Sequence, residues 1–333
     1  LVTAYKKNFG SNQNVRVDMN KVTGELHIYA QRHIVAEVGD DPNEISLEEA
    51  RKIDPRYEVD DIVETEVTPR NFGRIAAQNA KQVVVQRIRE AERGMVFEKF
   101  SSRENDIVTG IIQRMENKNV YIDLGKAEAI LTPNEQIPGE IYQYHDRMKT
   151  YIVEVKKTSK GPQIMVSRTH PGLLKRLFEL EVPEIHDGLV EIKSVAREPG
   201  MRSKISVYTK DENIDPVGAC VGHKGMRVQT IVNELHGEKI DIVKYSSEPD
   251  QYVANALSPA KVVSTEVLEE EKICRVIVPD YQLSLAIGKE GQNARLAAKL
   301  TGWKIDIKSE SQAAEEAEQG AQEVGVAYEA DED

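Results

Sequence analysis

The sequence predicts a multidomain α+β protein built from several small modules rather than from one large domain. Three observations lead to this prediction. The chain has 333 residues, enough for two or three domains, and only 5% are aromatic, which is few for one large core. Five short strand-like segments follow one another within residues 101–168. Residues 170–308 contain an internal repeat with a spacing of 65 to 66 residues.

Residues 1–98 are expected to form a mixed α/β domain. Alternating apolar residues over 15–28 predict a β-hairpin. Ser46, followed three positions later by Glu49, forms a capping box at the start of a short helix. Apolar residues at helical spacing then predict a long helix from about Phe72 to Arg93, which could join this domain to the next module.

Residues 99–168 fit a small five-stranded barrel of the OB type, because short strands alternate with turns rich in Gly, Pro and Asn. This fold is a common frame for oligonucleotide binding, which needs an exposed ring for stacking and cations beside it. Lys118 and Tyr121 are candidate contacts on one hairpin, and Arg147 and Lys149 precede the fourth strand. Tyr121 alternates with core positions, so a base platform and ordinary barrel packing both remain open.

The internal repeat is the most informative feature of the sequence. Two GxxG segments, Gly222–Gly225 and Gly288–Gly291, each lie between a short apolar helical stretch and a second helix. Each copy then closes with the same four letters, KIDI, at Lys239–Ile242 and Lys304–Ile307. A pair of strand-like segments precedes each copy. The repeating unit is therefore strand, strand, helix, GxxG, helix, strand.

A GxxG segment by itself carries little information, because 21 glycines in this chain give about 1.3 matches by chance. The shared context of the two copies makes the signal specific. Glycines allow a tight turn between helices, and the next helix points free N–H groups at whatever covers the loop. A helix–turn–helix corner without a ligand is the alternative. Because the KH fold clamps an RNA backbone in this way, we predict tandem KH domains over 169–246 and 247–308.

The two loops differ in charge. His223 and Lys224 make the first loop electropositive, whereas Lys289 in the second is followed by Glu290, which repels a phosphate. We therefore expect the first loop to hold the RNA backbone more strongly. Cations on adjacent helices and hairpins complete the predicted set of RNA-binding residues. The set is Gly222, His223, Lys224, Gly225, Arg227, Gly288, Lys289, Gly291, Arg295, Arg202, Lys204, Lys118 and Tyr121.

The net charge of −12 does not exclude a nucleic-acid partner, because the charge is unevenly distributed. Residues 309–333 contain nine acidic residues and no Lys or Arg, which leaves 47 acidic against 44 basic residues in 1–308. The body is thus close to neutral. The tail is expected to be disordered and to keep the protein in solution. Competition of the tail with phosphate for basic surfaces is the alternative.

Other functional classes find no support in the sequence. The chain has two cysteines, Cys220 and Cys274, which are too few for a disulfide framework. Its seven histidines do not have the spacing of metal ligands, so no metal site is predicted. No catalytic motif is present, so we expect a binding protein that is not an enzyme and has no cofactor. No apolar run is long enough for a membrane span. Because the chain has so few cysteines, we expect the protein to be located in a reducing cytoplasm. Because Leu1 is not Met, we also expect the sequence to begin inside a longer protein.

Three stretches resemble the NusA family of bacterial transcription elongation and termination factors. They are Asp215–Gly225 (DPVGACVGHKG), Ala286–Ile307 (AIGKEGQNARLAAKLTGWKIDI) and Asp54–Arg93. The family has the same order of an N-terminal domain, an S1-type OB domain and two KH domains, and the resemblance covers about residues 1–308. It implies that residues 1–98 dock on RNA polymerase near the RNA exit channel. It further implies that the barrel and KH pair bind single-stranded nascent RNA, and that pausing, termination and antitermination are affected, with antitermination factors as further partners.

Three departures from the family pattern bear on function. First, a segment that helps to contact polymerase is expected to be absent before Leu1. Second, only an acidic tail over 309–333 follows the second KH module. Third, the barrel has few aromatic residues on which bases could stack. Two alternative functions remain, because KH and S1-type modules also occur in other RNA-binding proteins. The chain would then be an RNA-binding accessory subunit of an RNA-decay complex or of a ribosome-associated complex.

Overall fold

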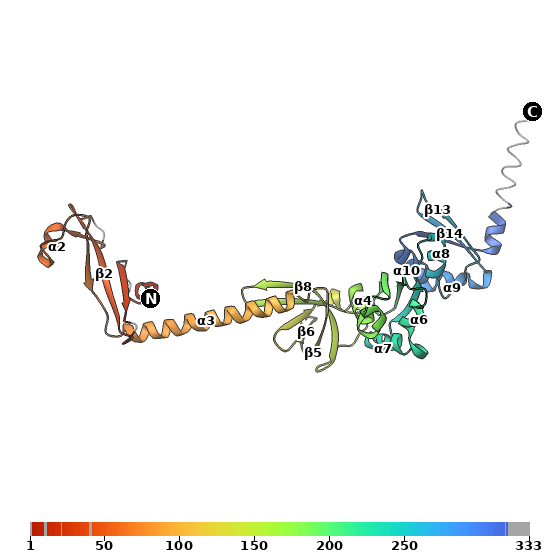
Figure 1. Cartoon of the computed structure of the whole chain (residues 1–333), viewed down its shortest axis with the longest axis horizontal. Helices are drawn as coiled ribbons and strands as arrows, with labels where there is room; N and C mark the ends of the chain where they lie inside the picture. Colours follow the sequence, from red (N-terminus) through yellow and green to blue (C-terminus); the bar gives the residue numbers. More distant parts are fainter. Residues whose placement is uncertain (1, 10–11, 21, 40–41, 317, 319–333) are drawn as a thin grey trace, which may run out of the picture. The chain divides into compact units, whose positions relative to one another are not determined.

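The computed structural model describes residues 2–9, 12–20, 22–39, 42–316 and 318. The chain divides into two units, Leu1–Gly94 and Met95–Asp333, each of which has its own internal packing. Helix α3 (Phe72–Ser101) contributes residues to both units (Figure 1).

The first unit is a four-stranded sheet with two short helices and the larger part of α3, up to Gly94. Strand β2 is central, pairing antiparallel with β1 and β4 and parallel with β3. The predicted hairpin is present, although Lys21 of its turn lies outside the described residues. Ser46 caps α2 as predicted, since its side chain accepts from the Glu49 N–H at 3.3 Å. The elements before α3 are α1 (Val2–Phe9), β1 (Asn14–Met19), β2 (Leu26–Val35), β3 (Glu44–Ser46), α2 (Leu47–Ile53) and β4 (Ile62–Glu66).

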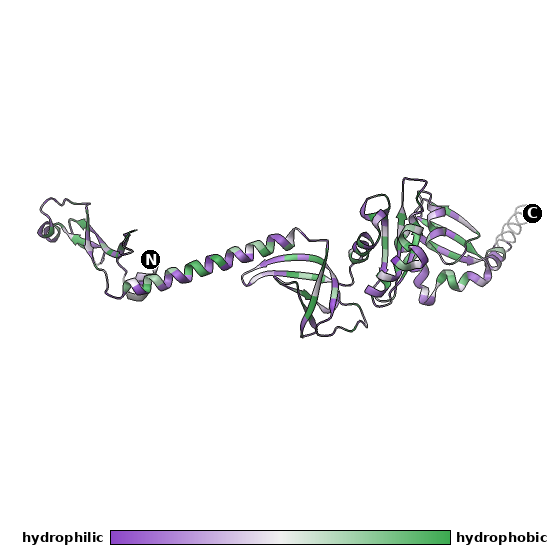
Figure 2. Ribbon diagram, turned by 60° about the horizontal axis from the view of Figure 1, so that its bottom comes forward, coloured by the Kyte–Doolittle hydropathy of each residue, from purple (hydrophilic) through white to green (hydrophobic). Residues whose placement is uncertain are grey.

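Helix α3 continues to Ser101, beyond the predicted end at Arg93. Gly94 is the residue of lowest helix propensity near the predicted end, and one glycine costs only about 1 kcal/mol in a helix. Apolar and polar residues alternate along the helix (Figure 2), and Val84 and Ile88 are 56% and 53% exposed. The predicted helix is therefore present, but most of its apolar residues are not packed against other described residues of the chain.

Residues 107–167 form the predicted five-stranded barrel, which is closed in the order β5-β6-β7-β9-β8 (Figure 1). Ile112, Ile122, Leu131, Ile152 and Ile164 are completely buried inside it. The strands are β5 (Ile107–Glu116), β6 (Asn119–Asp123), β7 (Glu128–Leu131), β8 (Arg147–Thr158) and β9 (Gly161–Ser167), with a 3-10 turn η1 (Pro133–Glu135).

Two modules of the predicted topology follow the barrel. Each has a three-stranded sheet whose first two strands are antiparallel and whose third strand is parallel to the middle one. The first module comprises β10 (Glu191–Glu198), β11 (Arg202–Tyr208), α6 (Pro216–Val221), η2 (His223–Gly225), α7 (Met226–Glu234) and β12 (Lys239–Lys244). The second comprises β13 (Ser264–Leu268), β14 (Ile273–Val278), η3 (Asp280–Gln282), α9 (Leu283–Ile287), η4 (Lys289–Gly291), α10 (Gln292–Thr301) and β15 (Lys304–Ser309).

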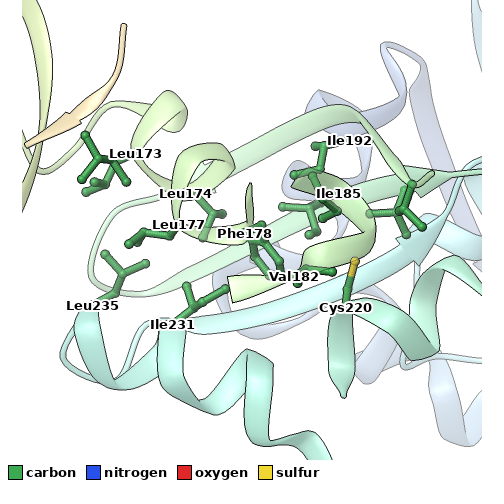
Figure 3. Close-up of a cluster of buried hydrophobic side chains, with 14 of the residues drawn as sticks. Leu173, Leu174, Leu177, Phe178, Val182, Ile185, Ile192, Cys220, Ile231 and Leu235 are labelled. Atoms are coloured by element: carbon green, nitrogen blue, oxygen red, sulfur yellow. The ribbon is translucent and has the colours of Figure 1, made fainter. Parts of the chain in front are cut away.

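Each module also has helices before its first strand that were not predicted. They are α4 (Pro171–Glu181) and α5 (Pro183–His186) in the first module and α8 (Pro249–Ala256) in the second. Leu177 and Phe178 of α4 pack with Ile231 of α7 and with Leu235, the residue directly after α7, in the core of the first module (Figure 3). Tyr151 of the barrel belongs to the same cluster. The barrel and the first module therefore share one hydrophobic core.

The second module packs on the outer face of the sheet of the first module. Ala196 and Val243, on the outer face of the first sheet, belong to the core cluster of the second module. Tyr252 of α8 donates to Ser206 Oγ on that face at 2.8 Å. The helices of the second module thus cover the sheet of the first, which fixes where the second loop lies relative to the first.

The tail corrects one prediction. Residues 309–333 were expected to be disordered, but residues 310–316 are helical. The cause is a capping box that the acidic composition obscured: the Gln312 N–H donates to Ser309 Oγ at 3.3 Å, and the Ser309 N–H donates to Gln312 Oε1 at 3.1 Å. Ser311 N also lies 3.4 Å from Asp280 Oδ1. The remainder of the tail, except residue 318, lies outside the described residues.

Candidate nucleic-acid interface

The two GxxG loops have the same backbone conformation. Gly222 and Gly288 have φ/ψ of 74°/175° and 76°/170°, and the loops end in left-handed glycines at 76°/13° (Gly225) and 73°/15° (Gly291). The third residue of each loop is also left-handed although it is not glycine, with φ of 50° at Lys224 and 54° at Glu290. Such a conformation is unfavourable for a residue with a side chain and is often found at functional sites.

The first glycine of each loop is required by its surroundings as well as by its φ angle. A Cβ atom at Gly222 would lie 2.7 Å from Cγ of Arg227, and one at Gly288 would lie 2.8 Å from Cβ of Asn293. Arg227 Nη1 donates to the Ala219 carbonyl at 2.6 Å, and Asn293 Nδ2 donates to the Ala286 carbonyl at 3.0 Å. In both modules, therefore, a side chain from the second helix binds the end of the first helix and closes the loop.

Arg227 has this structural role in the first loop, which sequence reasoning did not reveal. Its guanidinium also pairs with Glu184 at 2.9 Å and is only 30% exposed. His223 and Lys224, in contrast, are exposed at the tip of the first loop. In the second loop, Lys289 is exposed at the position of His223, and Glu290 is exposed at the position of Lys224. The exposed positive charge at the loops therefore comes from Lys224 and Lys289, with His223 beside Lys224 and the acidic Glu290 beside Lys289.

Arg295 connects the second loop to the first module. Its Nε donates to Glu198 Oε1 at 2.6 Å, and its Nη1 donates to the Glu290 carbonyl at 3.2 Å. Gln292 donates to Glu198 Oε2 at 2.8 Å. The hydrogen bond and charge of Arg295 hold the pKa of Glu198 below its usual value. Arg295, which was predicted as an RNA contact, thus also fixes the position of the second loop.

The structure contradicts the prediction that Lys204 faces RNA. Its side chain is completely buried between the two modules, where Nζ lies 2.9 Å from Asp241 Oδ2 and donates to the Ser258 carbonyl at 2.7 Å. Burial lowers the pKa of Lys204, and Asp241 partly opposes that effect. Arg202 is held by the same carboxylate at 2.8 Å. Strand alternation places residue 204 on the sheet face that the second module covers, and the sequence did not reveal this contact.

On the barrel, Lys118 and Tyr121 lie on the β5–β6 hairpin as predicted. Lys118 is exposed, in a turn with φ of 65°. Tyr121 is half-buried, and the Arg114 guanidinium lies 3.7 Å from the centroid of its ring. Arg114 is in turn held by Glu128 at 2.9 Å. One face of the Tyr121 ring is therefore occupied from within the barrel, which leaves at most its other face for a base.

A buried ionic network joins the barrel to the first KH module. Arg168 is completely buried and pairs with Glu140 and with Glu234, the latter at 3.3 Å. Lys149, a predicted candidate, pairs with Glu234 at 3.0 Å, and Arg147 is exposed. Burial raises the pKa of Glu140, but the Arg168 contacts outweigh that effect and the net pKa is lowered. Lys149 thus has a structural role as well.

Other kinds of site are not seen in the described part of the chain. There, no three His, Cys, Asp or Glu side chains lie close enough together to hold a metal ion. No helix among the described residues is both long and apolar enough to cross a membrane. Cys220 is buried as predicted, and burial raises the pKa of its thiol to about 12, so it is not a reactive thiolate.

Comparison with known families assigns the N-terminal unit, the barrel and both repeat modules. The profile of the NusA N-terminal domain matches residues 1–94, and that of the S1 RNA binding domain matches 101–167. The NusA-like first KH domain matches 168–245, and the NusA-like second KH domain matches 249–315.

The chain belongs to the NusA family.

Individual NusA proteins are similar over almost the whole chain. The transcription termination/antitermination protein NusA of Halalkalibacterium halodurans is 67% identical over 95% of this chain and 82% of its own length. The NusA proteins of Bacillus subtilis and Thermus thermophilus are 67% and 44% identical, covering 95% and 89% of this chain and 85% and 76% of their own lengths. The solution structure of the N-terminal domain of B. subtilis NusA is 60% identical over 28% of this chain and 74% of that chain, with a TM-score of 0.25.

Proposed function

We propose that the chain is a bacterial transcription factor that modulates pausing, termination and antitermination. Its N-terminal unit binds RNA polymerase, and its S1 and KH domains bind the nascent single-stranded RNA. It acts in the cytoplasm as a non-enzymatic adaptor, with antitermination factors as further partners. Because one end is held on polymerase, weak RNA contacts at the other end gain a high effective concentration and stay occupied.

One observation carries the RNA part of the proposal: two loops with the same left-handed backbone each present an exposed lysine, Lys224 or Lys289, before a helix of nine or ten residues. The N-terminus of such a helix attracts anions, and a lysine beside it adds a positive charge. Family membership supports the transcriptional part, since the names of the similar NusA proteins describe transcription termination and antitermination.

RNA binding is tested by titrating a labelled single-stranded RNA against Lys224→Asp and Lys289→Asp. We expect both variants to bind more weakly, and Lys224→Asp to lose more because Glu290 already weakens the second loop. Lys52→Asp is the matched control, because Lys52 is exposed on α2 in the other unit. Equal losses in all three variants would show that the loops are not the binding site.

Polymerase binding is tested by co-elution with core bacterial RNA polymerase, comparing the whole chain with a variant that lacks residues 1–94. The whole chain should co-elute, and the shortened chain should not, provided that circular dichroism shows it to be folded. Co-elution of both would place the polymerase contact in residues 95–333. Failure of both would remove the transcriptional proposal and leave RNA binding. Labelled RNA that stays intact with the chain and Mg²⁺ would support the non-enzymatic role.

A further inference from the structure

We propose that Glu290 makes the second KH domain selective for RNA over DNA, by accepting a hydrogen bond from a ribose 2′-hydroxyl group. The inference rests on the proposed RNA binding and assigns a specificity-determining residue within the second loop. Glu290 is exposed, and the equivalent position of the first loop is occupied by exposed Lys224. One loop therefore presents an acidic side chain where the other presents a basic one.

The two side chains project from the same backbone conformation. Lys224 has φ/ψ of 50°/26° and Glu290 has 54°/28°. The glycines that flank them also agree, with φ of 74° and 76° in the first loop and 76° and 73° in the second. Each Cβ atom thus leaves an equivalent point of its loop. A difference in ligand preference between the loops therefore comes from the side chains and not from the backbone.

The Glu290 carboxylate is available to a ligand. Arg295 Nη1 donates to the backbone carbonyl of Glu290 at 3.2 Å, and Arg295 Nε donates to Glu198 Oε1 at 2.6 Å. This arginine is therefore directed at the backbone of the loop and at the first module. Within the described residues, no hydrogen bond or ion pair involves the carboxylate of Glu290.

The chemistry of a carboxylate restricts what it contacts on a nucleic-acid backbone. An ionised carboxylate only accepts hydrogen bonds, and the negative charge of a phosphate repels it. A KH loop clamps the sugar-phosphate backbone, where the ribose 2′-hydroxyl is the hydrogen-bond donor. DNA lacks this group. Glu290 therefore gains a charge-assisted hydrogen bond with RNA, whereas with DNA it contributes only repulsion.

The rest of the second loop increases the importance of this hydrogen bond. Lys289, directly before Glu290, is exposed and attracts a phosphate, and along a strand each ribose adjoins a phosphate. The side chain that closes the second loop is the neutral Asn293, whereas Arg227 closes the first. The second loop thus has fewer basic side chains than the first. A larger share of its affinity should therefore depend on hydrogen bonding.

The two loops would consequently have different tasks. The first loop, with Lys224, attracts the phosphates of any single strand, and the second loop accepts the strand only if it carries 2′-hydroxyl groups. A transcribing polymerase exposes single-stranded DNA as well as nascent RNA. Selectivity at the second loop would keep the KH pair on the transcript.

The test uses the whole chain and short labelled oligomers of uridine, in the form of RNA, 2′-fluoro RNA and deoxyuridine DNA. Fluorine retains the sugar conformation of RNA but cannot donate a hydrogen bond. The quantity compared is the association constant for RNA divided by that for each analogue. We expect Glu290→Ala to lower both ratios about 5-fold, because RNA loses a hydrogen bond while the analogues lose a repulsive charge. Glu290→Gln should retain more of both ratios, because its amide oxygen still accepts.

Glu270→Ala is the matched control, because Glu270 is equally acidic and exposed in the same module, in the turn between β13 and β14. It should leave both ratios unchanged. If Glu290→Ala strengthens binding of all three oligomers by the same factor, Glu290 only repels and the inference is overturned. A fall in the DNA ratio alone would also overturn it, since the sugar conformation would then be what is recognised.

Failure of this inference is distinguishable from failure of the proposed function. If Lys224→Asp weakens RNA binding while the ratios do not respond to Glu290→Ala, RNA binding stands and only the role of Glu290 falls. If the wild-type chain binds none of the oligomers, the proposed RNA binding and the role of Glu290 both fall.

Discussion

Arg295 of the second KH module and Glu198 of the first are joined by a hydrogen-bonded ion pair with an Nε–Oε1 distance of 2.6 Å. Arg295 also donates to the Glu290 carbonyl, inside the second loop. The pair thus connects a strand end of one module to the RNA loop of the other. Its strength is limited by solvent, because the Arg295 side chain is 47% exposed.

This arrangement predicts non-additive effects of substitution. Arg295→Ala and Glu198→Ala should each lower the free energy of unfolding slightly, and the double variant should lose little more than the worse single one. A double-mutant cycle by urea denaturation measures this coupling. Losses that simply add would show that the two residues do not interact in solution.

The first loop allows two effects on glycine to be separated. Gly222→Ala introduces both a strained φ and a clash with Arg227, whereas Gly225→Ala introduces only the strained φ, because the space around Gly225 is open. We expect Gly225→Ala to cost about 1 kcal/mol of stability and Gly222→Ala to cost more and to weaken RNA binding further. Thermal unfolding and RNA titration of the two variants measure both quantities. Equal effects would count against the role of Arg227 in closing the loop.

The buried network around Arg168 should be essential for the stability of residues 95–333. Arg168→Ala leaves Glu140 buried without its main partner, which typically costs about 3–5 kcal/mol. Urea denaturation gives the value. Lys156→Ala is the control, because Lys156 forms an exposed ion pair with Glu154 in the same barrel and should change stability little.

Stability should fall in acid through a second buried pair, Arg197–Glu238. Burial raises the pKa of Glu238, but hydrogen bonds from Arg197, Ser203 and the Gly200 N–H outweigh it, so the pKa lies below the usual 4.5. A lowered pKa contributes stability above about pH 4.5, and that contribution is lost as the pH falls through the folded-state pKa. Urea midpoints between pH 7 and pH 3 should therefore fall less steeply for Glu238→Gln than for the wild type.

RNA binding should depend only weakly on salt. If Lys224 and Lys289 each neutralise one phosphate of a single strand, the logarithm of the association constant falls with the logarithm of salt with a slope of about −1.4. Titrations between 50 and 300 mM KCl give the slope. A value several times steeper would reveal a basic track across other elements, and the slope of Lys224→Asp would identify the contribution of the first loop.

Local patterns were sufficient to predict most of this fold. Helices α6 and α9 lie directly before the GxxG loops as predicted, and Gly222 and Gly288 end them. Helices α4 and α8 were missed, because each precedes the strand pair with which the predicted repeating unit begins. The two loops and their glycines could be predicted because the loop conformation depends on local sequence. Lys204 was misassigned because its burial results from packing between modules, which no local pattern records.

The order of packing within the KH pair has a consequence for the residues that follow the second sheet. The second module covers the outer face of the first sheet, so the second sheet has an equivalent face that the next segment of the chain can cover. The cavity on the second sheet is lined by Arg275 and Asp306 and by Ala313 and Glu316 of residues 310–316. Residues 310–316 therefore lie beside the outer face of the second sheet, at the place that the second module takes on the first sheet.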